Sequence, residues 1–252
     1  MRFEGKTALI TGAGRGIGLA VAHELARGGA DLALNDLDGE RLKASAAALR
    51  EHGAKVSMHV GSVTAEGVAD RMVSEAVAEH RKIDLLVNNA GGGPVATPWQ
   101  AFSKTPTSDL RAFFELNFFS QATLLHLVLP DMVDRGYGKI VCVSSISAIL
   151  GQENGAPYAA AKAALHGLVS SVSKEVARHG VTINAVVLGN PPHPSRTPDR
   201  QDYLNHLSHF DRVGRFEEFG KAIAFLLSDD SSYISGAAVP IDGGILAPRL
   251  NE

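Results

Sequence analysis

Short apolar segments alternate with stretches of helical period along this chain, and this alternation restricts its fold more than any other feature. The apolar segments lie at 7–11, 31–35, 55–60, 83–88, 139–144, 181–187 and 237–241. The helical patterns lie near 16–28, 38–52, 64–80, 107–134, 157–179 and 216–228. Alternating strands and helices are typical of a parallel sheet covered on both faces. We therefore expect an α/β fold, a doubly wound, Rossmann-like sheet of seven parallel strands, in a single domain over 1–252.

The composition is that of an ordinary globular protein and argues against several classes. A net charge of −3 offers no basic surface to nucleic acid or to an anionic membrane. The single cysteine, Cys142, lies in an apolar segment and allows no disulfide within the chain. We find neither a signal peptide nor an apolar run long enough to span a bilayer. We expect a cytoplasmic protein without nucleic-acid or membrane partners.

The segment from Gly189 to about Arg215 interrupts the alternation. It carries four prolines, which disfavour a regular structure at its start. Because it follows the sixth apolar segment, it emerges at the carboxyl edge of the sheet, where ligands bind in this architecture. We therefore expect a substrate loop at 189–215, in which Arg196 and Arg200 would suit a polar or acidic substrate. Its histidines lack a compact metal-ligand spacing, so we expect no metal site; they are His193, His206 and His209.

A glycine-rich turn, Thr11 to Gly18, follows the first apolar segment and precedes a helical pattern. Glycines let backbone N–H groups approach a pyrophosphate, and the N-terminus of the following helix adds its positive dipole end. The spacing is T-G-x-x-x-G-x-G rather than G-x-G-x-x-G. The turn predicts a dinucleotide site, and the alternative is a turn that only packs a helix against a strand.

Asp36 ends the second apolar segment, where an acid can accept hydrogen bonds from the ribose hydroxyls of NAD. The same charge would repel the extra phosphate of NADP. Arg15 favours the opposite outcome, since a guanidinium beside the glycine turn could bind that phosphate. We expect NAD as the cofactor, with NADP less favoured. The alternative for Asp36 is a helix N-cap or a turn residue ahead of Leu37-Asp38-Gly39.

Tyr158 and Lys162 lie four residues apart on the apolar stripe of the helical pattern at 157–179. An ammonium on a face meant for burial is unusual, because leaving water unpaired is very costly for a charge. A cation beside a phenol predicts a device that lowers the pKa of the phenol toward working pH. The alternative is a lysine whose stem lies along an ordinary helix surface with its head in water.

Taken in order, these motifs resemble the short, single-domain branch of the short-chain dehydrogenase/reductases over Lys6 to Gly244. The likeness rests on T-G-x-x-x-G-x-G at 11–18, N-N-A-G at 88–91, Asn117, Ser145, Y-x-x-x-K at 158–162 and Asp242-Gly243-Gly244. The resemblance implies an enzyme that transfers a hydride between NAD(P) and the carbon of a secondary alcohol or ketone. It also implies a homotetramer with the helices at 107–134 and 157–179 in the interface, although their apolar surface fits core packing equally well.

The resemblance also assigns roles to particular residues. Tyr158 would exchange a proton with the substrate oxygen, Lys162 would lower its pKa and bind the nicotinamide ribose, and Ser145 would hydrogen-bond the substrate oxygen. Asn117 would hold a water that relays protons, or its amide is satisfied by a neighbouring carbonyl. Family spacing alone selects Ser145 over Ser144. The implied cofactor site comprises Gly12, Arg15, Gly16, Ile17, Gly18, Asp36, Leu37, Ser62, Val63, Asn89, Ala90, Gly91, Tyr158, Lys162 and Gly189.

Three positions depart from the family pattern. Ser62 stands where an aspartate usually contacts adenine, Leu188 precedes Gly189 where proline is usual, and His193 takes the place of a threonine. These departures leave open a second function, a catalytically silent cofactor-binding sensor or scaffold on the same fold. A sugar epimerase or dehydratase of the family's longer branch is disfavoured by chain length and by the spacing of the glycine turn.

Overall fold

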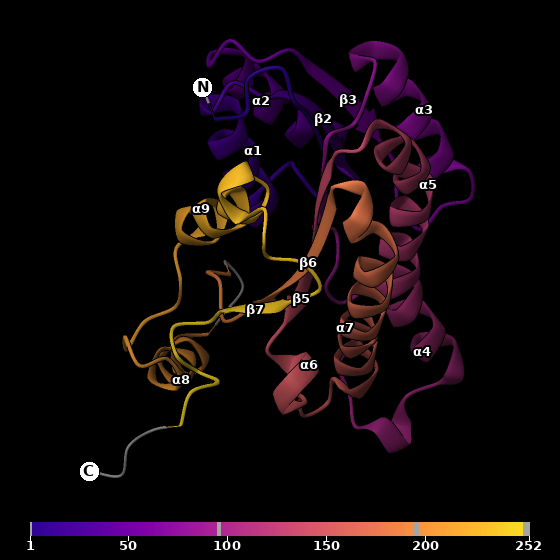
Figure 1. The fold of residues 1–252 in the computed structure, drawn as a ribbon. Coiled ribbons are helices and arrows are strands. Elements are labelled where there is room, and N and C mark those ends of the chain that lie inside the picture. The colour runs from indigo at the N-terminus through magenta and orange to yellow at the C-terminus, as the bar shows by residue number, and fades with distance from the viewer. Residues whose placement is uncertain (1, 95–96, 194–196, 249–252) are drawn as a thin grey trace.

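A parallel sheet forms the centre of the molecule (Figure 1). The computed structural model describes residues 2–94, 97–193 and 197–248. Within them the sheet has seven strands in the order β3-β2-β1-β4-β5-β6-β7, and each neighbouring pair is parallel. The strands are β1 Thr7–Thr11, β2 Asp31–Asp36, β3 Val56–Val60, β4 Leu85–Asn88, β5 Gly138–Ser145, β6 Val181–Leu188 and β7 Ala238–Ile241. The predicted fold class is confirmed.

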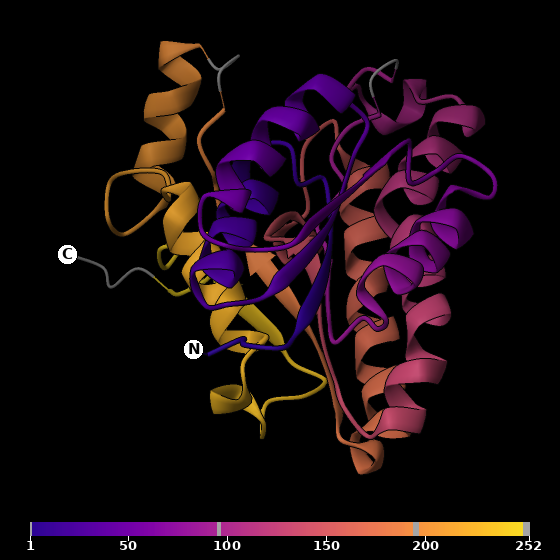
Figure 2. The same cartoon turned by 90° about the horizontal axis from the view of Figure 1, so that it is seen from above.

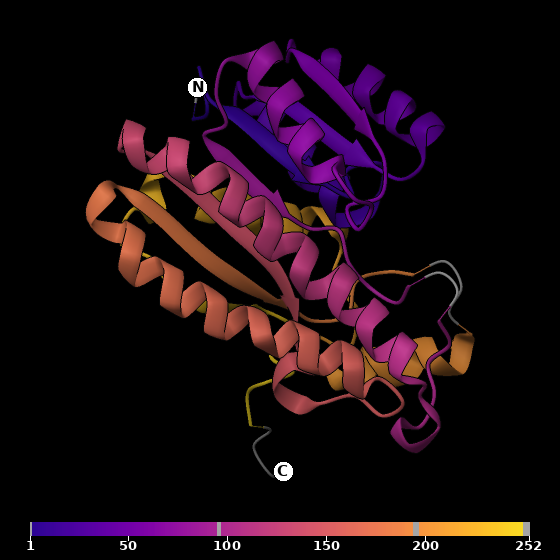
Figure 3. The ribbon, with the colours of Figure 1, turned by 90° about the vertical axis from the view of Figure 1, so that its right-hand side faces the viewer.

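Helices cover both faces of the sheet, and each face has its own apolar cluster. One face is covered by α1 (Gly16–Arg27), α2 (Gly39–Arg50) and α9 (Phe216–Leu226), which lie together on the same side of the sheet in Figures 1 and 2. The other is covered by α3 (Val68–His80), α5 (Ser120–Arg135) and α7 (Ala156–Val176), which lie in front of it in Figure 3. Because both faces of the sheet are covered, β1, β4 and β6 are buried along their whole length and mostly apolar rather than alternating.

The strand order reverses between β1 and β4, so the segments that follow these two strands lead to opposite faces of the sheet. In open α/β sheets ligands bind at this point, outside the carboxyl ends of the strands. Around this edge lie α6 (Ser147–Leu150), which follows β5, and α8 (Pro198–Leu207), which follows β6. Both lie at the lower end of the molecule in Figure 1, on either side of the sheet's edge. The candidate residues of the glycine turn and of α7 belong to this edge.

One long helix corrects an expectation from the sequence. The helix α4 (Thr107–Phe114), a π-helical turn (Glu115–Phe119) and α5 run on without a break over 29 residues, and by length and composition this stretch could cross a membrane. The expectation of no such run was therefore wrong. However, α5 packs against the sheet and α3, with Leu124, Leu125, Val128 and Met132 buried in the core. A core helix of this kind passes the same test.

The segment after β6 is more regular than its prolines suggest. Pro198 occupies the first turn of α8, where a missing N–H costs nothing, and the hydroxyl of Thr197 accepts the backbone N–H of Arg200 at 3.4 Å. The far end of the segment is pinned to the sheet edge, because His209 N donates to Gly243 O (2.9 Å) and Gly214 N to Asn190 O (3.0 Å). Arg196 lies outside the described residues.

Candidate active site

The turn after β1 has the shape that a pyrophosphate site requires. Gly12 and Gly16 adopt positive φ angles of 64° and 59°, which favour glycine. Gly18 lies inside α1 with ordinary geometry, yet a Cβ there would collide with the carbonyl oxygen of Gly12. Its glycine is therefore needed for the close approach of α1 to the turn. Ile17 packs on the core cluster, and Arg15 is exposed at the N-cap of α1.

Asp36 is buried at the end of β2, and its carboxylate holds the glycine turn. One oxygen accepts the N–H of Gly14 at 2.9 Å and the other accepts the N–H of Asp38 at 3.0 Å. Asp38, and not Asp36, is the N-cap of α2, since it accepts the N–H of Arg41. Asp36 is therefore not the helix cap, but it is the turn residue that the alternative also allowed, because its side chain accepts the N–H two residues on. Leu37 follows with 65% of its surface exposed.

The segment after β4 is fastened to the glycine turn. Asn89 donates from its amide to the carbonyls of Thr11 (2.9 Å) and Gly12 (3.1 Å). The hydroxyl of Thr11 accepts the N–H groups of both Asn89 and Ala90 at 3.0 Å. These bonds fix the turn after β1 and the segment after β4 against each other. The N-N-A-G motif therefore carries structural bonds that an ordinary strand-to-loop turn would lack.

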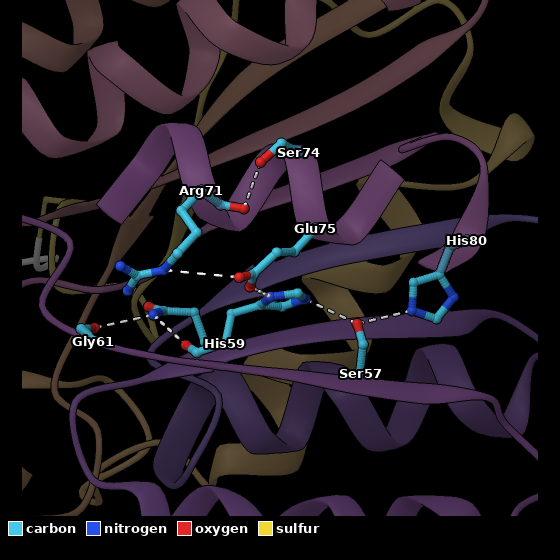
Figure 4. A network of polar contacts seen from close by, with 8 residues as sticks. Ser57, His59, Gly61, Arg71, Ser74, Glu75 and His80 are labelled. Atoms are coloured by element: carbon cyan, nitrogen blue, oxygen red, sulfur yellow. Dashed lines mark hydrogen bonds and ion pairs between the residues drawn. The ribbon is translucent and has the colours of Figure 1, made fainter. Parts of the chain in front are cut away.

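The turn after β3 is held by a polar network between β3 and α3 (Figure 4). His59 contacts Glu75 at 3.0 Å and Ser57 at 2.9 Å, and His80 contacts Ser57 at 2.9 Å. The amide of Asn35 donates to the carbonyls of His59 and Gly61. A hollow of about 260 Å³ lies beside this network and includes none of the four predicted catalytic residues.

Ser62 and Val63, two residues of the expected cofactor site, follow this network. The hydroxyl of Ser62 contacts that of Thr64 at 2.8 Å and accepts the N–H of Thr64 at 3.3 Å. Val63 lines a shallow hollow of about 180 Å³ between α3 and α5. The hydroxyl of Ser62 is therefore hydrogen-bonded within its own turn. A carboxylate at this position could make the same kind of bond.

Lys162 is buried beside Tyr158 near the end of β5. It is 2% exposed, so the surface-lysine alternative is wrong. Its ammonium nitrogen donates to the carbonyl of Val143 at 2.7 Å and lies 5.9 Å from the centre of the Tyr158 ring. Ser145 lies near enough to the Tyr158 hydroxyl to lower the pKa of that phenol. The spacing of four residues along α7 thus brings the buried Lys162 and the half-buried Tyr158 to one place at the carboxyl edge.

The pKa values of this pair shift in the directions that burial imposes. Burial raises the pKa of Tyr158, and the hydrogen bond with Ser145 opposes that rise. Burial lowers the pKa of Lys162 from 10.5 to about 7. Without a cofactor, the ammonium is therefore not the fixed charge that the sequence argument assumed. An anionic dinucleotide nearby would favour the charged lysine. We therefore expect the pKa of the Tyr158 phenol to be lowered only when the dinucleotide is bound.

Asn117 lies in the π-helical turn and is fully buried. Its amide donates to the carbonyls of Gly92 (2.8 Å) and Phe113 (3.0 Å), while its oxygen accepts the N–H of Gly92 (2.8 Å). A Cβ on Gly91 would lie 2.9 Å from both Asn117 Oδ1 and Lys162 Nζ. The side chain of Asn117 therefore clamps the loop after β4, as the backbone-satisfied alternative described. π-Helical turns are frequent at functional sites.

Two polar residues of this edge were not singled out from the sequence. Gln121 donates to the same Val143 carbonyl as Lys162, at 3.3 Å. Asn190 follows Gly189, where a Cβ would lie 2.7 Å from the backbone of Asp242. Among the described residues, buried atoms without a partner include Gln121 Oε1 and Asn190 Nδ2. Gln121 could have been noticed in the sequence, because it is a polar residue in an otherwise apolar stretch of helix.

The residues present fit a dinucleotide. The turn after β1 has glycines where Cβ atoms would collide with Asp36, Asn89 and the turn itself, so its backbone stays close to these groups. The first N–H groups of α1 have no partner within the helix, and Asn190 offers an unused buried donor at the end of β6. Within the described part of the chain, no group of three His, Cys, Asp or Glu side chains is placed to hold a metal ion.

Known proteins share both this sequence pattern and this fold. Residues 6–202 match the family model of the short chain dehydrogenases. L-rhamnose 1-dehydrogenase (NAD(P)(+)) from Sphingomonas sp. is 33% identical, with 96% of each chain aligned.

Solved structures agree with the sequence comparison. Levodione reductase superposes with a TM-score of 0.92 at 32% identity, over 98% of this chain and all of that one. NAD+-bound xylitol dehydrogenase superposes with a TM-score of 0.90 at 30% identity, over 97% of this chain and all of that one. This chain is a member of the short chain dehydrogenase family, oxidoreductases that act on CH–OH and C=O groups with NAD(H) or NADP(H).

Proposed function

We propose that this enzyme interconverts a secondary alcohol and a ketone, with NAD as the preferred cofactor and Tyr158 as the acid/base. The observation that supports this most is that the half-buried Tyr158 and Ser145 lie together with the buried Lys162. Asn117 holds the neighbouring loop through Gly92, and a Cβ on Gly91 would lie 2.9 Å from both Asn117 Oδ1 and Lys162 Nζ. A phenol, a hydroxyl and an ammonium at one place are the groups that a carbonyl oxygen needs when it gains or loses a proton.

In this proposal each side chain acts on the substrate oxygen or on its neighbour. Ser145 donates to the oxygen and orients it, and Tyr158 gives or takes the proton. Lys162 has one donor on Val143 O, which leaves two for a ribose hydroxyl and for a proton relay. The bound nicotinamide supplies the hydride acceptor or donor. Asn117 keeps the loop after β4 against this group, so that the cofactor side of the site is fixed before substrate enters.

The preference for NAD rests on Asp36. Its carboxylate is buried and accepts the N–H groups of Gly14 and Asp38, which hold it where an adenosine ribose would lie. A second negative group brought against it would be repelled in a poorly solvated place. We also propose that residues 1–252 act as one dinucleotide-binding domain, with the segment 189–215 as its substrate loop.

The proposal is tested by offering NAD+ with a panel of secondary alcohols, and NADH with the matching ketones, while the near-ultraviolet absorbance of NADH is followed. We expect absorbance to rise with alcohols and to fall with ketones, because the same group of side chains serves both directions. NADH affinity is measured in parallel by fluorescence titration. Tight binding of NADH without any absorbance change across the panel would contradict the proposal and favour the cofactor-binding sensor.

A further inference from the structure

Trp99 stands directly against Tyr158, on the segment between β4 and α4. The two rings meet edge to face, with centres 5.3 Å apart and planes at 66°. The other side of the indole meets Phe113 in the same way, at 5.3 Å and 71°. Edge-to-face pairs of this kind are favourable and fix the orientation of both rings. The large side chain beside the phenol is therefore held in a defined pose.

Two glycines make room for this indole. A Cβ on Gly93 would lie 2.7 Å from Nε1 of Trp99, and a Cβ on Gly155 would lie 2.6 Å from its Cζ3. Neither glycine has a positive φ, so backbone conformation does not demand glycine at either position. Glycine is needed at both positions because a larger side chain would collide with the indole. Gly155 is also the N-cap of α7, so the element that carries Tyr158 begins against Trp99.

The indole is nevertheless 42% exposed, and it is not alone at this edge. Other large apolar side chains on the segments that follow β4, β5 and β6 are also exposed by half or more. They are Phe102, Ile149, Leu150, Tyr203 and Phe210. Exposed apolar side chains that gather at one edge mark a binding surface rather than a random surface.

The arginines of the segment after β6 already contact other side chains, and these contacts would weaken their binding to an acidic substrate. Arg200 lies over the ring of Tyr203, at 4.9 Å from its centre. Arg212 and Arg215 both pair with Glu218, at 2.7 and 3.1 Å. The apolar groups, and not these arginines, are thus the surface that remains for a substrate among the described residues of this edge.

We propose that Trp99 is the wall of the substrate site, and that the substrate is an uncharged secondary alcohol or ketone carried on an alicyclic ring. A flat, immobile aromatic surface suits a rigid apolar ring, because the ring buries area without losing conformational freedom. This inference rests on the proposed function. The ring carbon loses its hydride to NAD+, the C–O bond becomes a carbonyl, and the hydroxyl proton passes to Tyr158.

The first test compares cyclohexanol with hexan-3-ol, which has the same number of carbons in an open chain. We expect kcat/KM to favour the ring in the wild type by about tenfold or more, and Trp99→Ala to remove most of that preference. Trp99→Phe should retain part of it. Phe225→Ala is the matched control, because this exposed aromatic of α9 lies beside Arg2, away from the carboxyl edge, and should leave the ratio unchanged. An equal loss for both alcohols in Trp99→Ala, or the same effect from Phe225→Ala, would overturn the proposal.

The second test does not depend on turnover. Trp99 is the only tryptophan of the chain, so intrinsic tryptophan fluorescence reports on this wall alone. With NAD+ bound, cyclohexanone cannot react and should change that fluorescence at concentrations where hexan-3-one does not. Equal responses to both ketones, or none to either, would contradict the wall.

The two proposals fail in different ways. Tyr158→Phe should lose turnover of both alcohols and keep the fluorescence response to cyclohexanone, because binding against Trp99 does not need the phenol hydroxyl. Turnover retained in Tyr158→Phe would remove the acid/base role and leave the wall standing. A wild type that turns over open-chain and ring alcohols alike would remove the wall and leave the acid/base role standing.

Discussion

Lys162 is a base held where water cannot reach it, and this has a measurable consequence. Its pKa is about 7 in the folded chain, against an ordinary value of 10.5. Between these values the unfolded chain binds a proton that the folded chain does not, so this group makes the free energy of unfolding rise with pH. The cost of burying the ammonium lowers the free energy of unfolding by its full amount below about pH 7, where both states are protonated. This cost is gone above about pH 10.5, where neither state is protonated.

We therefore expect Lys162→Met to flatten the pH dependence of stability without cofactor between about pH 7 and pH 10. One proton of difference corresponds to a slope of at most about 1.4 kcal/mol per pH unit. Urea unfolding at a series of pH values measures it. Lys174→Met is the control, because Lys174 is an exposed lysine of the same helix. Identical slopes in wild type and Lys162→Met would show that the ammonium is not buried as described.

Asp36 sets a prediction for cofactor choice. Asp36→Asn keeps the size of the side chain and an oxygen for the N–H of Gly14, but removes the charge. We expect it to bring the Kd of NADPH closer to that of NADH by about tenfold, since a close like-charge repulsion is worth at least that much away from bulk water. Asp38→Asn, at the nearby N-cap of α2, should leave the ratio unchanged.

Binding titrations with both cofactors decide between Asp36 and Arg15. If the wild type binds NADPH as tightly as NADH, and Arg15→Ala weakens NADPH alone, then the exposed guanidinium governs the choice and the reading of Asp36 is wrong.

The approach of α1 to the glycine turn depends on one missing methyl group. Because a Cβ at Gly18 would collide with the carbonyl of Gly12, Gly18→Ala must push α1 away from β1. We expect a loss of about 1–3 kcal/mol in unfolding free energy, together with weaker NADH binding. Thermal unfolding and NADH titration of the same preparation measure both effects.

Gly167→Ala in α7 is the matched control for that substitution. Nothing lies within 4 Å of its Cβ position, so alanine should stabilise the helix by about 0.5–1 kcal/mol and leave NADH affinity unchanged. Equal behaviour of the two variants would mean that α1 does not pack as closely as the structure has it.

The strands and long helices were predictable because their apolar residues repeat with a clear period. All seven strands and six main helices appear within a few residues of their predicted ranges. The short α6 and α8 were not predicted, since their residues carry no apolar stripe and the prolines of 191–198 suggested irregular backbone. Pro198 instead begins a helix. The π-helical turn around Asn117 is also invisible to periodicity, because it changes the pitch for only five residues.

The residues of the candidate site also differ in whether the sequence could predict their positions. Tyr158 and Lys162 were predictable because four-residue spacing places them on one helix face. Trp99 was not, because its position against Tyr158 depends on two glycines that are distant in sequence, Gly93 and Gly155. The direction of the Tyr158 pKa was also beyond the sequence, since it follows from burial. Contacts between segments, rather than patterns within them, set these features.

For the whole molecule we propose the homotetramer implied by the family resemblance. The continuous helix Thr107–Arg135 exposes Phe119 by 48%, and its ring packs on Phe118 at 5.2 Å. We expect sedimentation to give a mass of four chains for the wild type, and a smaller species for Phe119→Glu, because a carboxylate would be buried unpaired in the interface.

Phe225→Glu is the control for that experiment. Phe225 is 39% exposed on α9, on the opposite face of the sheet, and its replacement should leave the mass unchanged. A wild type that sediments as a single chain would remove the tetramer. The same disruption by both variants would mean that the effect is general and not specific to this helix.

Hydride transfer in Tyr158→Phe tests the central claim most directly. The substitution removes one hydroxyl and keeps the ring against Trp99. The rate of a single turnover is followed by NADH absorbance, and NADH affinity is measured in the same preparation. We expect the rate to fall by about 10²–10⁴, the contribution of a positioned acid/base, with NADH affinity unchanged. A variant that transfers hydride at the wild-type rate would contradict the account.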